Sequence, residues 1–148
     1  MPRIVREVNT TWEGNVARGE GAITASSSGA FVDLPFTLAS RIAKPEGKTS
    51  PEELLAAAHS GCFTMSLATE LSRAGTPPTR LETHCVVTMD EIEGKGHQIV
   101  HSQIEVRGEV PDCDEAAFAQ AAEAADAGCP FSALIRGTAT VGVSASLL

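Results

Sequence analysis

The sequence predicts an α+β fold with mostly antiparallel strands, in the element order β-β-β-α-β-β-α-β. Short segments of alternating polarity with glycine-containing turns fill the first third of the chain and recur after the middle. A long helical segment lies between the two groups of strands, and grouped strands of this kind are typical of α+β proteins. At 148 residues, the chain is expected to form one domain, residues 1–148, with its own hydrophobic core.

The first third predicts three strands. Alternation from Arg3 to Trp12 predicts the first, and Gly21 to Ala25 and Ala30 to Leu38 predict two more around a serine-rich turn. The stretch from Arg41 to Ser50, rich in charge, proline and glycine, is expected to be an exposed loop.

A long helix is predicted from Pro51 to Ala74. Ser50 is a natural N-cap, Pro51 occupies the first helical position, and Glu53 completes a capping box with Ser50. Apolar residues recur at helical spacing through this segment, and Gly75 ends it. Its middle turns are apolar on most sides, so we expect protein to surround it.

A strand hairpin follows, formed by Leu81 to Ile92 and Ile99 to Val110 around a glycine-containing turn. Asp112 is expected to cap a second helix, Glu115 to Ala127, with Glu115 completing the capping box.

The chain then ends with a short helix and a strand. Cys129 to Arg136 predicts a turn of helix with Pro130 first, and Thr138 to Leu147 predicts the last strand from its small and β-branched residues.

Composition narrows the classes of partner. A net charge of −8 disfavours nucleic acid and anionic membrane surfaces, because both need basic patches. The N-terminus has no apolar signal region, and charges interrupt every apolar stretch well short of a membrane span, so a cytoplasmic protein is expected.

Four cysteines are present without a CxxC pair, so neither a zinc ribbon nor a disulfide framework is well supported. Cys62 lies in the middle of the long helix among small residues. Cys129 lies at the start of the short helix, where unpaired backbone N–H groups favour a thiolate. If the fold brings these two thiols together, they can form a redox couple. Each could instead be a small buried apolar side chain, which is the expected role of Cys85 and Cys113.

Several motifs resemble the OsmC/Ohr family of thiol peroxidases, and the resemblance spans essentially the whole chain. Trp12-Glu13-Gly14 and His59-Ser60-Gly61-Cys62 resemble the OsmC branch more than the Ohr branch. The motifs that carry the family resemblance are Pro51-Glu52-Glu53-Leu54, Ala56-Ala57-Ala58-His59, Gly61-Cys62-Phe63 and Gly128-Cys129-Pro130.

The resemblance implies a homodimer in which two swapped six-stranded sheets wrap two central helices. It implies reduction of organic hydroperoxides and, less well, hydrogen peroxide, in defence against oxidative or osmotic stress. Cys62 matches the peroxidatic position, Cys129 the resolving one and Glu52 the active-site glutamate. Arg41 is the best match for the family's arginine, and Arg18 is the runner-up. An external dithiol, such as a lipoylated protein, would reduce the Cys62–Cys129 disulfide after each turnover. No cofactor, metal, nucleic acid or membrane is implied.

The chemistry fits those roles. A thiolate is the nucleophile, and an arginine beside the sulfur favours the anion and polarises the O–O bond. A carboxylate beside the arginine would orient its fork. However, Glu52 and Cys62 are ten residues apart, about 15 Å along a continuous helix. Either the helix breaks, or the site is shared across a dimer, with Glu52 from the other chain and the arginine from either chain; we favour the shared site.

Two other functions remain open from the sequence. Cys62 with His59, three residues earlier, could form a cysteine hydrolase, although a hydrogen-bonded core histidine is favoured. The dithiol could also belong to a non-catalytic redox sensor. Apolar residues that could line a substrate pocket are Phe36, Leu38, Phe63, Met65 and Phe131.

Overall fold

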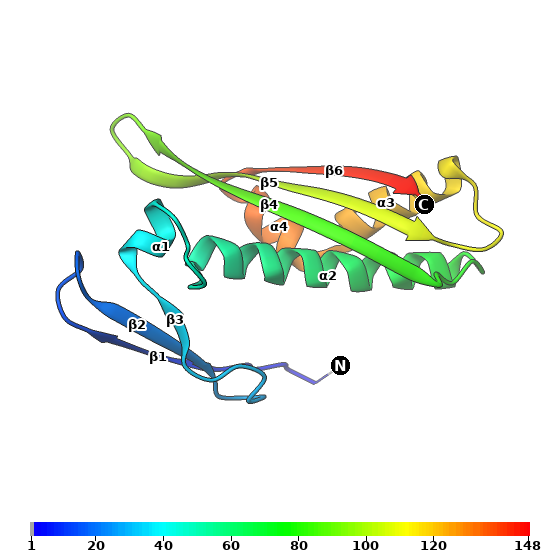
Figure 1. The fold of residues 1–148 in the computed structure, drawn as a ribbon. Coiled ribbons are helices and arrows are strands. Elements are labelled where there is room, and N and C mark those ends of the chain that lie inside the picture. Colours follow the sequence, from blue (N-terminus) through cyan, green and yellow to red (C-terminus); the bar gives the residue numbers. More distant parts are fainter. Residues whose placement is uncertain (1) are drawn as a thin grey trace. The chain divides into compact units, whose positions relative to one another are not determined.

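The computed structural model describes residues 2–148 and has the element order β-β-β-α-α-β-β-α-α-β (Figure 1). The predicted α+β class is confirmed. The short helix predicted after Gly128 is present, and one short helix before residue 51 was not predicted. The chain divides into two compact units, which we call the N-terminal unit (residues up to 54) and the C-terminal unit (residues 55–148). Within the described residues, no helix is long and apolar enough to cross a membrane.

The N-terminal unit holds a three-stranded antiparallel sheet in the order β1-β2-β3. Its strands are β1 (Val8–Glu13), β2 (Glu20–Ala25) and β3 (Leu34–Phe36). The first and third strands are shorter than the sequence predicts. Asp33, directly before β3, has a φ of 51°, a left-handed conformation that cannot continue an extended strand toward Ala30. All of β1 is exposed to solvent.

Helix α1 (Leu38–Ile42) occupies a segment where the sequence predicts a strand end and an exposed loop. Thr37 caps it through a reciprocal pair of hydrogen bonds: the Ser40 N–H donates to Thr37 Oγ1, and the Thr37 N–H donates to Ser40 Oγ, both at 3.0 Å. This is a capping box with serine in place of the usual Glu or Gln at the third position. It places Arg41 in the last turn of a helix rather than in a loop.

Helix α2 (Pro51–Arg73) confirms the long helix within one residue. Ser50 Oγ accepts a hydrogen bond from the Glu53 N–H at 3.2 Å, as a cap should. The predicted box is only half formed, because the Glu53 carboxylate accepts the Thr49 hydroxyl instead, at 2.8 Å. Gly75 follows the helix with a φ of 81°. The helix is unbroken, which excludes a break between Glu52 and Cys62.

The C-terminal unit holds a second sheet in the order β4-β5-β6. The hairpin of β4 (Arg80–Ile92) and β5 (Gly96–Glu109) is antiparallel, as predicted. The last strand, β6 (Thr140–Leu147), pairs with β5 in parallel, from His101 opposite Thr140 to Gly108 opposite Leu147. Parallel neighbours need a crossover connection, and two helices supply it.

These crossover helices are α3 (Glu115–Gly128) and α4 (Pro130–Arg136). The predicted cap Asp112 is wrong: it has a φ of 58°, whereas an N-cap residue is normally extended. Asp114 caps α3 instead, accepting the Ala117 N–H at 2.8 Å. Glu115 does not complete a box, because its carboxylate accepts the Leu147 N–H of β6 at 3.1 Å.

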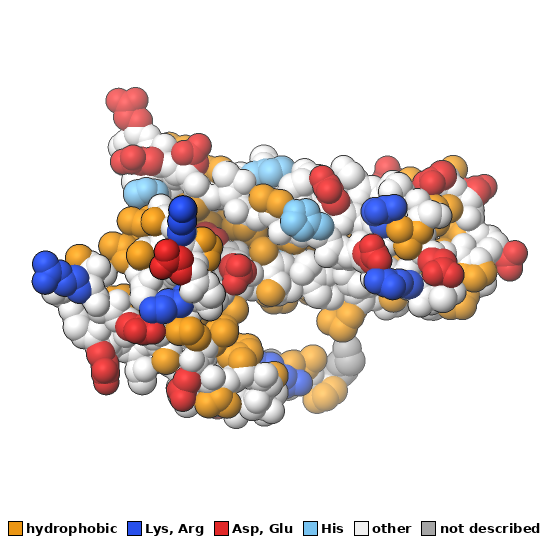
Figure 2. Space-filling view, viewed as in Figure 1, with side chains coloured by type: hydrophobic (Ala, Val, Ile, Leu, Met, Phe, Trp, Pro, Cys, Tyr) orange, Lys and Arg blue, Asp and Glu red, His pale blue; other side chains and the backbone are white. Residues whose placement is uncertain are grey.

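Helices α2 and α3 and the inner face of β5 build the core of the C-terminal unit. Alternate residues of β5 are buried, and the Phe118 ring of α3 lies against Gly108 so closely that a Cβ there would stand 2.7 Å from it. The core residues include Phe63, Leu67, Leu71, Ile104, Val106 and Phe118. In the described part of the N-terminal unit, Ala25 alone is a buried apolar residue, and Val8 is among the exposed apolar side chains. Figure 2 shows hydrophobic side chains at the surface of the molecule.

Candidate functional site

The C-terminal unit brings the two predicted site thiols together. Cys62 projects from α2 and is half-buried. Cys129 joins α3 to α4, ending the first helix and starting the second, and is 1% exposed. The Cys129 side chain lies within hydrogen-bonding reach of the Cys62 thiol. The sequence separates the two residues widely, and the crossover after β5 returns Cys129 to α2.

The surroundings of Cys62 oppose its ionisation within a single chain. Burial raises the pKa of the Cys62 thiol, and its contact with the Cys129 thiol raises the pKa further, while a hydrogen bond from the Phe131 backbone lowers it. The net shift is upward, so this thiol is mainly protonated near neutral pH. A nucleophilic Cys62 therefore needs a nearby positive charge that offsets this upward shift of its pKa.

The N-terminal unit pairs Glu52 with Arg41. The Arg41 Nε and Nη2 donate to the same oxygen, Glu52 Oε1, at 2.9 and 2.6 Å. Glu52 therefore orients the guanidinium fork, as expected, but through one carboxylate oxygen that accepts from two nitrogens. Glu52 Oε2 is buried and has no hydrogen-bond partner among the described residues.

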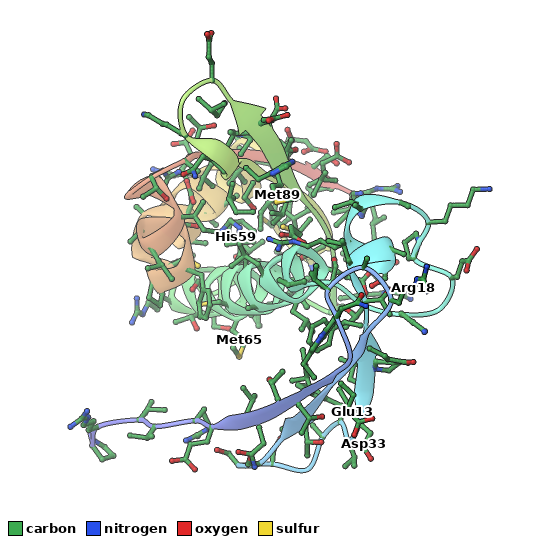
Figure 3. The ribbon with its side chains drawn as sticks, turned by 90° about the vertical axis from the view of Figure 1, so that its left-hand side faces the viewer. Glu13, Arg18, Asp33, His59, Met65 and Met89 are labelled. Atoms are coloured by element: carbon green, nitrogen blue, oxygen red, sulfur yellow. The ribbon has the colours of Figure 1, made fainter. Side chains whose placement is uncertain are left out.

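Arg18, the alternative arginine, does not make this pair. It lies in the turn between β1 and β2, where its backbone N–H donates to Asn15 Oδ1 at 3.0 Å, and it is exposed (Figure 3). Between the two candidates, the structure joins Arg41 to the predicted glutamate.

An apolar cavity of about 190 Å³ adjoins the Arg41 side chain within the N-terminal unit. Phe36 and Leu38 line it, as the sequence suggested for a substrate pocket, together with Trp12, which sequence reasoning did not include. Trp12 and Phe36 are ring neighbours, with centroids 5.6 Å apart. Gly21 makes room for the Phe36 ring, since a Cβ there would stand 2.3 Å from it. The motif Trp12-Glu13-Gly14, which carries part of the family resemblance, was the sequence signal that could have identified Trp12 as a lining residue.

The other predicted lining residues are not part of this cavity. Phe63 is fully buried in the core of the C-terminal unit, so it is not available to substrate. Met65 is 68% exposed on α2, and Phe131 is half-buried at the start of α4.

His59 is a hydrogen-bonded core histidine, as the sequence favoured. It points from α2 toward the sheet and is fully buried (Figure 3). Its Nδ1 lies 2.7 Å from Ser102 Oγ of β5, and its Nε2 lies 2.8 Å from Ser132 Oγ of α4. Both ring nitrogens are therefore occupied by serine hydroxyls, which argues against His59 as a base for Cys62. Sequence reasoning did not identify either serine.

The remaining cysteines fit structural roles. Cys85 is half-buried beside the histidine, with its Sγ 3.4 Å from Ser102 Oγ, and burial raises the pKa of its thiol. Cys113 is half-buried beside the core of the C-terminal unit.

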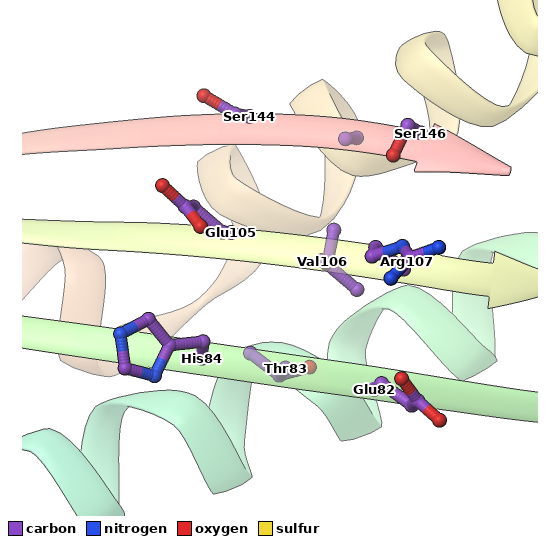
Figure 4. Close-up of a pocket in the computed structure, with 9 residues that line it drawn as sticks. Glu82, Thr83, His84, Glu105, Val106, Arg107, Ser144 and Ser146 are labelled. Atoms are coloured by element: carbon purple, nitrogen blue, oxygen red, sulfur yellow. The ribbon is translucent and has the colours of Figure 1, made fainter. Parts of the chain in front are cut away.

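A separate cavity of about 360 Å³ lies on the polar outer face of the second sheet (Figure 4). Its lining includes Glu82, His84, Glu105 and Arg107. Along their strands, these residues alternate with half-buried residues of β4 and buried residues of β5. None of the predicted site residues lines it.

Comparisons with known proteins identify the family of this chain. A model of the family described as OsmC-like protein matches residues 44–144. Peroxiredoxin OsmC of Escherichia coli (strain K12) is 34% identical over 130 residues, which covers 88% of this chain and 89% of the relative. Peroxiredoxin OsmC of Shigella flexneri matches with the same identity and coverage.

Solved structures show the same fold. The organic hydroperoxide resistance protein OhrB of Bacillus subtilis aligns with a TM-score of 0.74 at 24% identity, over 95% of this chain and 98% of that one. An OsmC-like protein of unknown function from Vibrio cholerae O1 aligns with a TM-score of 0.78 at 10% identity, over 97% of this chain and 100% of that one. With the family model matching well over half of its length, this chain belongs to the OsmC-like family.

Proposed function

We propose that this chain is a thiol-dependent peroxidase that reduces organic hydroperoxides and, less well, hydrogen peroxide. The observation that carries the proposal is the contact between the Cys62 and Cys129 thiols. The 34% identity to a protein named Peroxiredoxin OsmC supports it. The apolar cavity beside Arg41 suits the hydrocarbon part of an organic peroxide better than it suits hydrogen peroxide.

Cys62 is the peroxidatic residue in this proposal, and Cys129 is the resolving one. The Cys62 thiolate attacks one peroxide oxygen, the O–O bond breaks, and the alcohol leaves with a proton. Cys62 is then a sulfenic acid. The Cys129 thiolate attacks its sulfur, the S–O bond breaks, and hydroxide leaves and is protonated to water. An external dithiol, such as a lipoylated protein, reduces the disulfide by exchange.

Arg41, held by Glu52, supplies the cation that Cys62 needs. The upward pKa shift of Cys62 in the single chain creates the need for such a charge. We assign Arg41 and Glu52 to the partner chain of a homodimer, because unbroken α2 separates Glu52 from Cys62 by about 15 Å within one chain. Exposed apolar side chains on the N-terminal unit, Ile4, Val5 and Val8, are consistent with a surface that a second copy covers.

The cycle suits the cytoplasm, where dithiol reductants keep protein thiols reduced, and a role in defence against oxidative or osmotic stress. No cofactor or metal takes part in the proposed chemistry.

The main experiment mixes the reduced protein with cumene hydroperoxide and excess dithiol, and follows peroxide loss and free thiols. Wild type should turn over and form a Cys62–Cys129 disulfide. Cys62→Ser should abolish turnover, whereas Cys129→Ser should consume about one equivalent and then stall as sulfenic or over-oxidised Cys62. Cys113→Ser is the matched control and should retain turnover.

Other outcomes would favour the rival functions. Oxidation of the thiols without turnover in excess dithiol would identify a redox sensor. Hydrolysis of a thioester or amide without peroxide consumption would identify a cysteine hydrolase.

Mixed dimers test the shared site. Cys62→Ser and Arg41→Ala should each be inactive or strongly impaired as separate proteins. If each site combines Cys62 of one chain with Arg41 of the other, exchange of subunits should restore about a quarter of wild-type activity, since half the dimers are mixed and each holds one complete site. No recovery after verified subunit exchange would place Arg41 and Cys62 of one site in the same chain.

A further inference from the structure

A buried polar cluster joins the two elements that carry the site thiols. His59, Ser102 and Ser132 are all fully buried, and the histidine ring bridges the two serine hydroxyls at 2.7 and 2.8 Å. The three residues come from α2, β5 and α4. A neutral imidazole has one donor and one acceptor nitrogen, and each hydroxyl can turn to suit whichever it meets. The cluster thus satisfies both ring nitrogens without a charge.

The position of this cluster matters more than its composition. His59 precedes Cys62 by three residues on α2, and Ser132 follows Cys129 by three residues in the first turn of α4. The hydrogen bond between His59 Nε2 and Ser132 Oγ therefore ties the turn before one thiol to the turn after the other. At its far end, α4 is tied to α3 by the ion pair between Arg136 and Asp126.

The resolving step needs closer control of position than the first step does. A disulfide requires a sulfur–sulfur distance of about 2.05 Å and a narrow range of dihedral angles, so the two backbones must already be well placed. Peroxide is a small mobile reactant, whereas Cys129 is fixed to the junction of α3 and α4. The α4 turn has no side-chain cap at Cys129, so lateral contacts such as that of Ser132 must locate it.

We propose that His59 is a positioning residue for the resolving step: its buried hydrogen bond to Ser132 sets where α4 holds Cys129 against Cys62. This inference rests on the proposed peroxidase function. His59 exchanges no proton with either sulfur. It acts while the Cys129 thiolate attacks the Cys62 sulfenic acid, when the S–S bond forms, the S–O bond breaks and water leaves after protonation.

Two serine variants test this role as a matched pair. Ser132→Ala and Ser102→Ala each remove one hydroxyl, and one hydrogen bond, from the same buried histidine, but only the first removes a contact to α4. Stopped-flow mixing with cumene hydroperoxide, with dimedone trapping of the sulfenic acid, separates its formation from disulfide formation.

In Ser132→Ala, sulfenic acid formation should stay within about twofold of wild type, while disulfide formation should slow about 10- to 100-fold, as ångström-scale misplacement of reacting groups can do. Sulfenic acid should accumulate, and over-oxidation to sulfinic acid should increase. In Ser102→Ala, the rate of disulfide formation should stay within about threefold of wild type, because α4 keeps its contact with His59. Ser132→Thr, which keeps the hydroxyl, should restore part of the lost rate.

Equal slowing by the two alanine variants would overturn the proposal, because it would show a general loss of packing. An unchanged resolving rate in Ser132→Ala would also overturn it. Circular dichroism checks that each variant is folded; if Ser132→Ala is not, His59→Gln replaces it, with the same slow resolving step expected and a normal rate contradicting the proposal. A wild-type protein that forms no Cys62 sulfenic acid would instead refute the peroxidase function itself.

Discussion

The two units of this chain carry different parts of the proposed site and are built differently. The C-terminal unit buries phenylalanine, leucine, isoleucine and valine side chains around its thiols, whereas the described part of the N-terminal unit buries one apolar residue, Ala25. The thiol pair thus adjoins a packed core, which favours the defined geometry that a disulfide needs. The arginine and its glutamate stand in a thin sheet-and-helix unit whose apolar surface remains largely exposed.

In each unit, a glycine leaves room for an aromatic ring, but the two rings have different roles. Gly108 admits Phe118 to the core of the C-terminal unit, while Gly21 admits Phe36 to the wall of the cavity beside Arg41. The close approach of a ring to a glycine thus supports core packing in the C-terminal unit and shapes a cavity in the N-terminal unit. Substitutions in the two units should accordingly affect different measurements.

The largest expected effect is on stability, in the C-terminal unit. Phe118→Ala should lower the free energy of unfolding by about 3–5 kcal/mol, because a fully buried ring is replaced by a cavity. Val32→Ala, at a 65% exposed position of the N-terminal unit, should change it by no more than about 0.5 kcal/mol. Urea unfolding followed by circular dichroism measures both. An equal loss at the two positions would contradict the contrast between the units.

The next effect is on chemistry, in the N-terminal unit. On the proposed shared site, Arg41→Ala removes the positive charge beside the reacting sulfur and should slow sulfenic acid formation about a hundredfold. Burial and the Cys129 thiol already raise the pKa of Cys62. Without the arginine charge to oppose them, this pKa should rise further. Stopped-flow peroxide reduction and pH-dependent alkylation of Cys62 measure these changes.

Arg18→Ala is the matched control for Arg41→Ala, because Arg18 lies exposed in a turn of the same unit. It should leave the rate nearly unchanged. If Arg18→Ala were the more damaging substitution, the assignment of Arg41 would be wrong.

The smallest effect is on acid stability and belongs to the C-terminal unit. Burial lowers the pKa of His59, and Arg136 lowers it too, while Asp126 opposes the shift; the neighbouring Cys85 thiol is neutral, since burial raises its pKa. The unfolded chain therefore binds a proton at a higher pH than the folded protein. The full contribution to stability is present above about pH 6.5 and is lost as the pH falls below that value toward the folded-state pKa.

Urea unfolding at pH 7 and pH 5.5 measures this loss, which cannot exceed about 1.4 kcal/mol per pH unit for one proton. His59→Gln should reduce the pH dependence, because glutamine does not titrate. The same pH dependence in wild type and variant would show that other groups cause it.

Local signals in the sequence predicted much of the fold. Ser50, Pro51 and Gly75 define the ends of α2 because capping and glycine geometry act over a few residues. Sequence reasoning missed α1 because its capping box uses Ser40 in place of a glutamate. It chose Asp112 over Asp114 as the α3 cap because the left-handed φ of Asp112 has no simple sequence signature.

The candidate site likewise contains residues that the sequence predicted and residues that it did not. Cys62, Cys129, Glu52 and Arg41 were found from motifs, whereas Ser102, Ser132 and Trp12 were not. A serine has no sequence pattern that marks it as the partner of a distant histidine, because that pairing depends on which strand and helix pack over α2.

By itself, the sequence determined most of the secondary structure of this protein, its family and the residue types of its chemistry, since these follow from local backbone preferences and short motifs. Only the tertiary structure decided that β6 runs parallel to β5 and that the connection between them returns Cys129 to Cys62. It also decided that Arg41 reaches Glu52 and that His59 is held by two serines. These contacts join residues far apart in the chain, and long-range packing alone selects them.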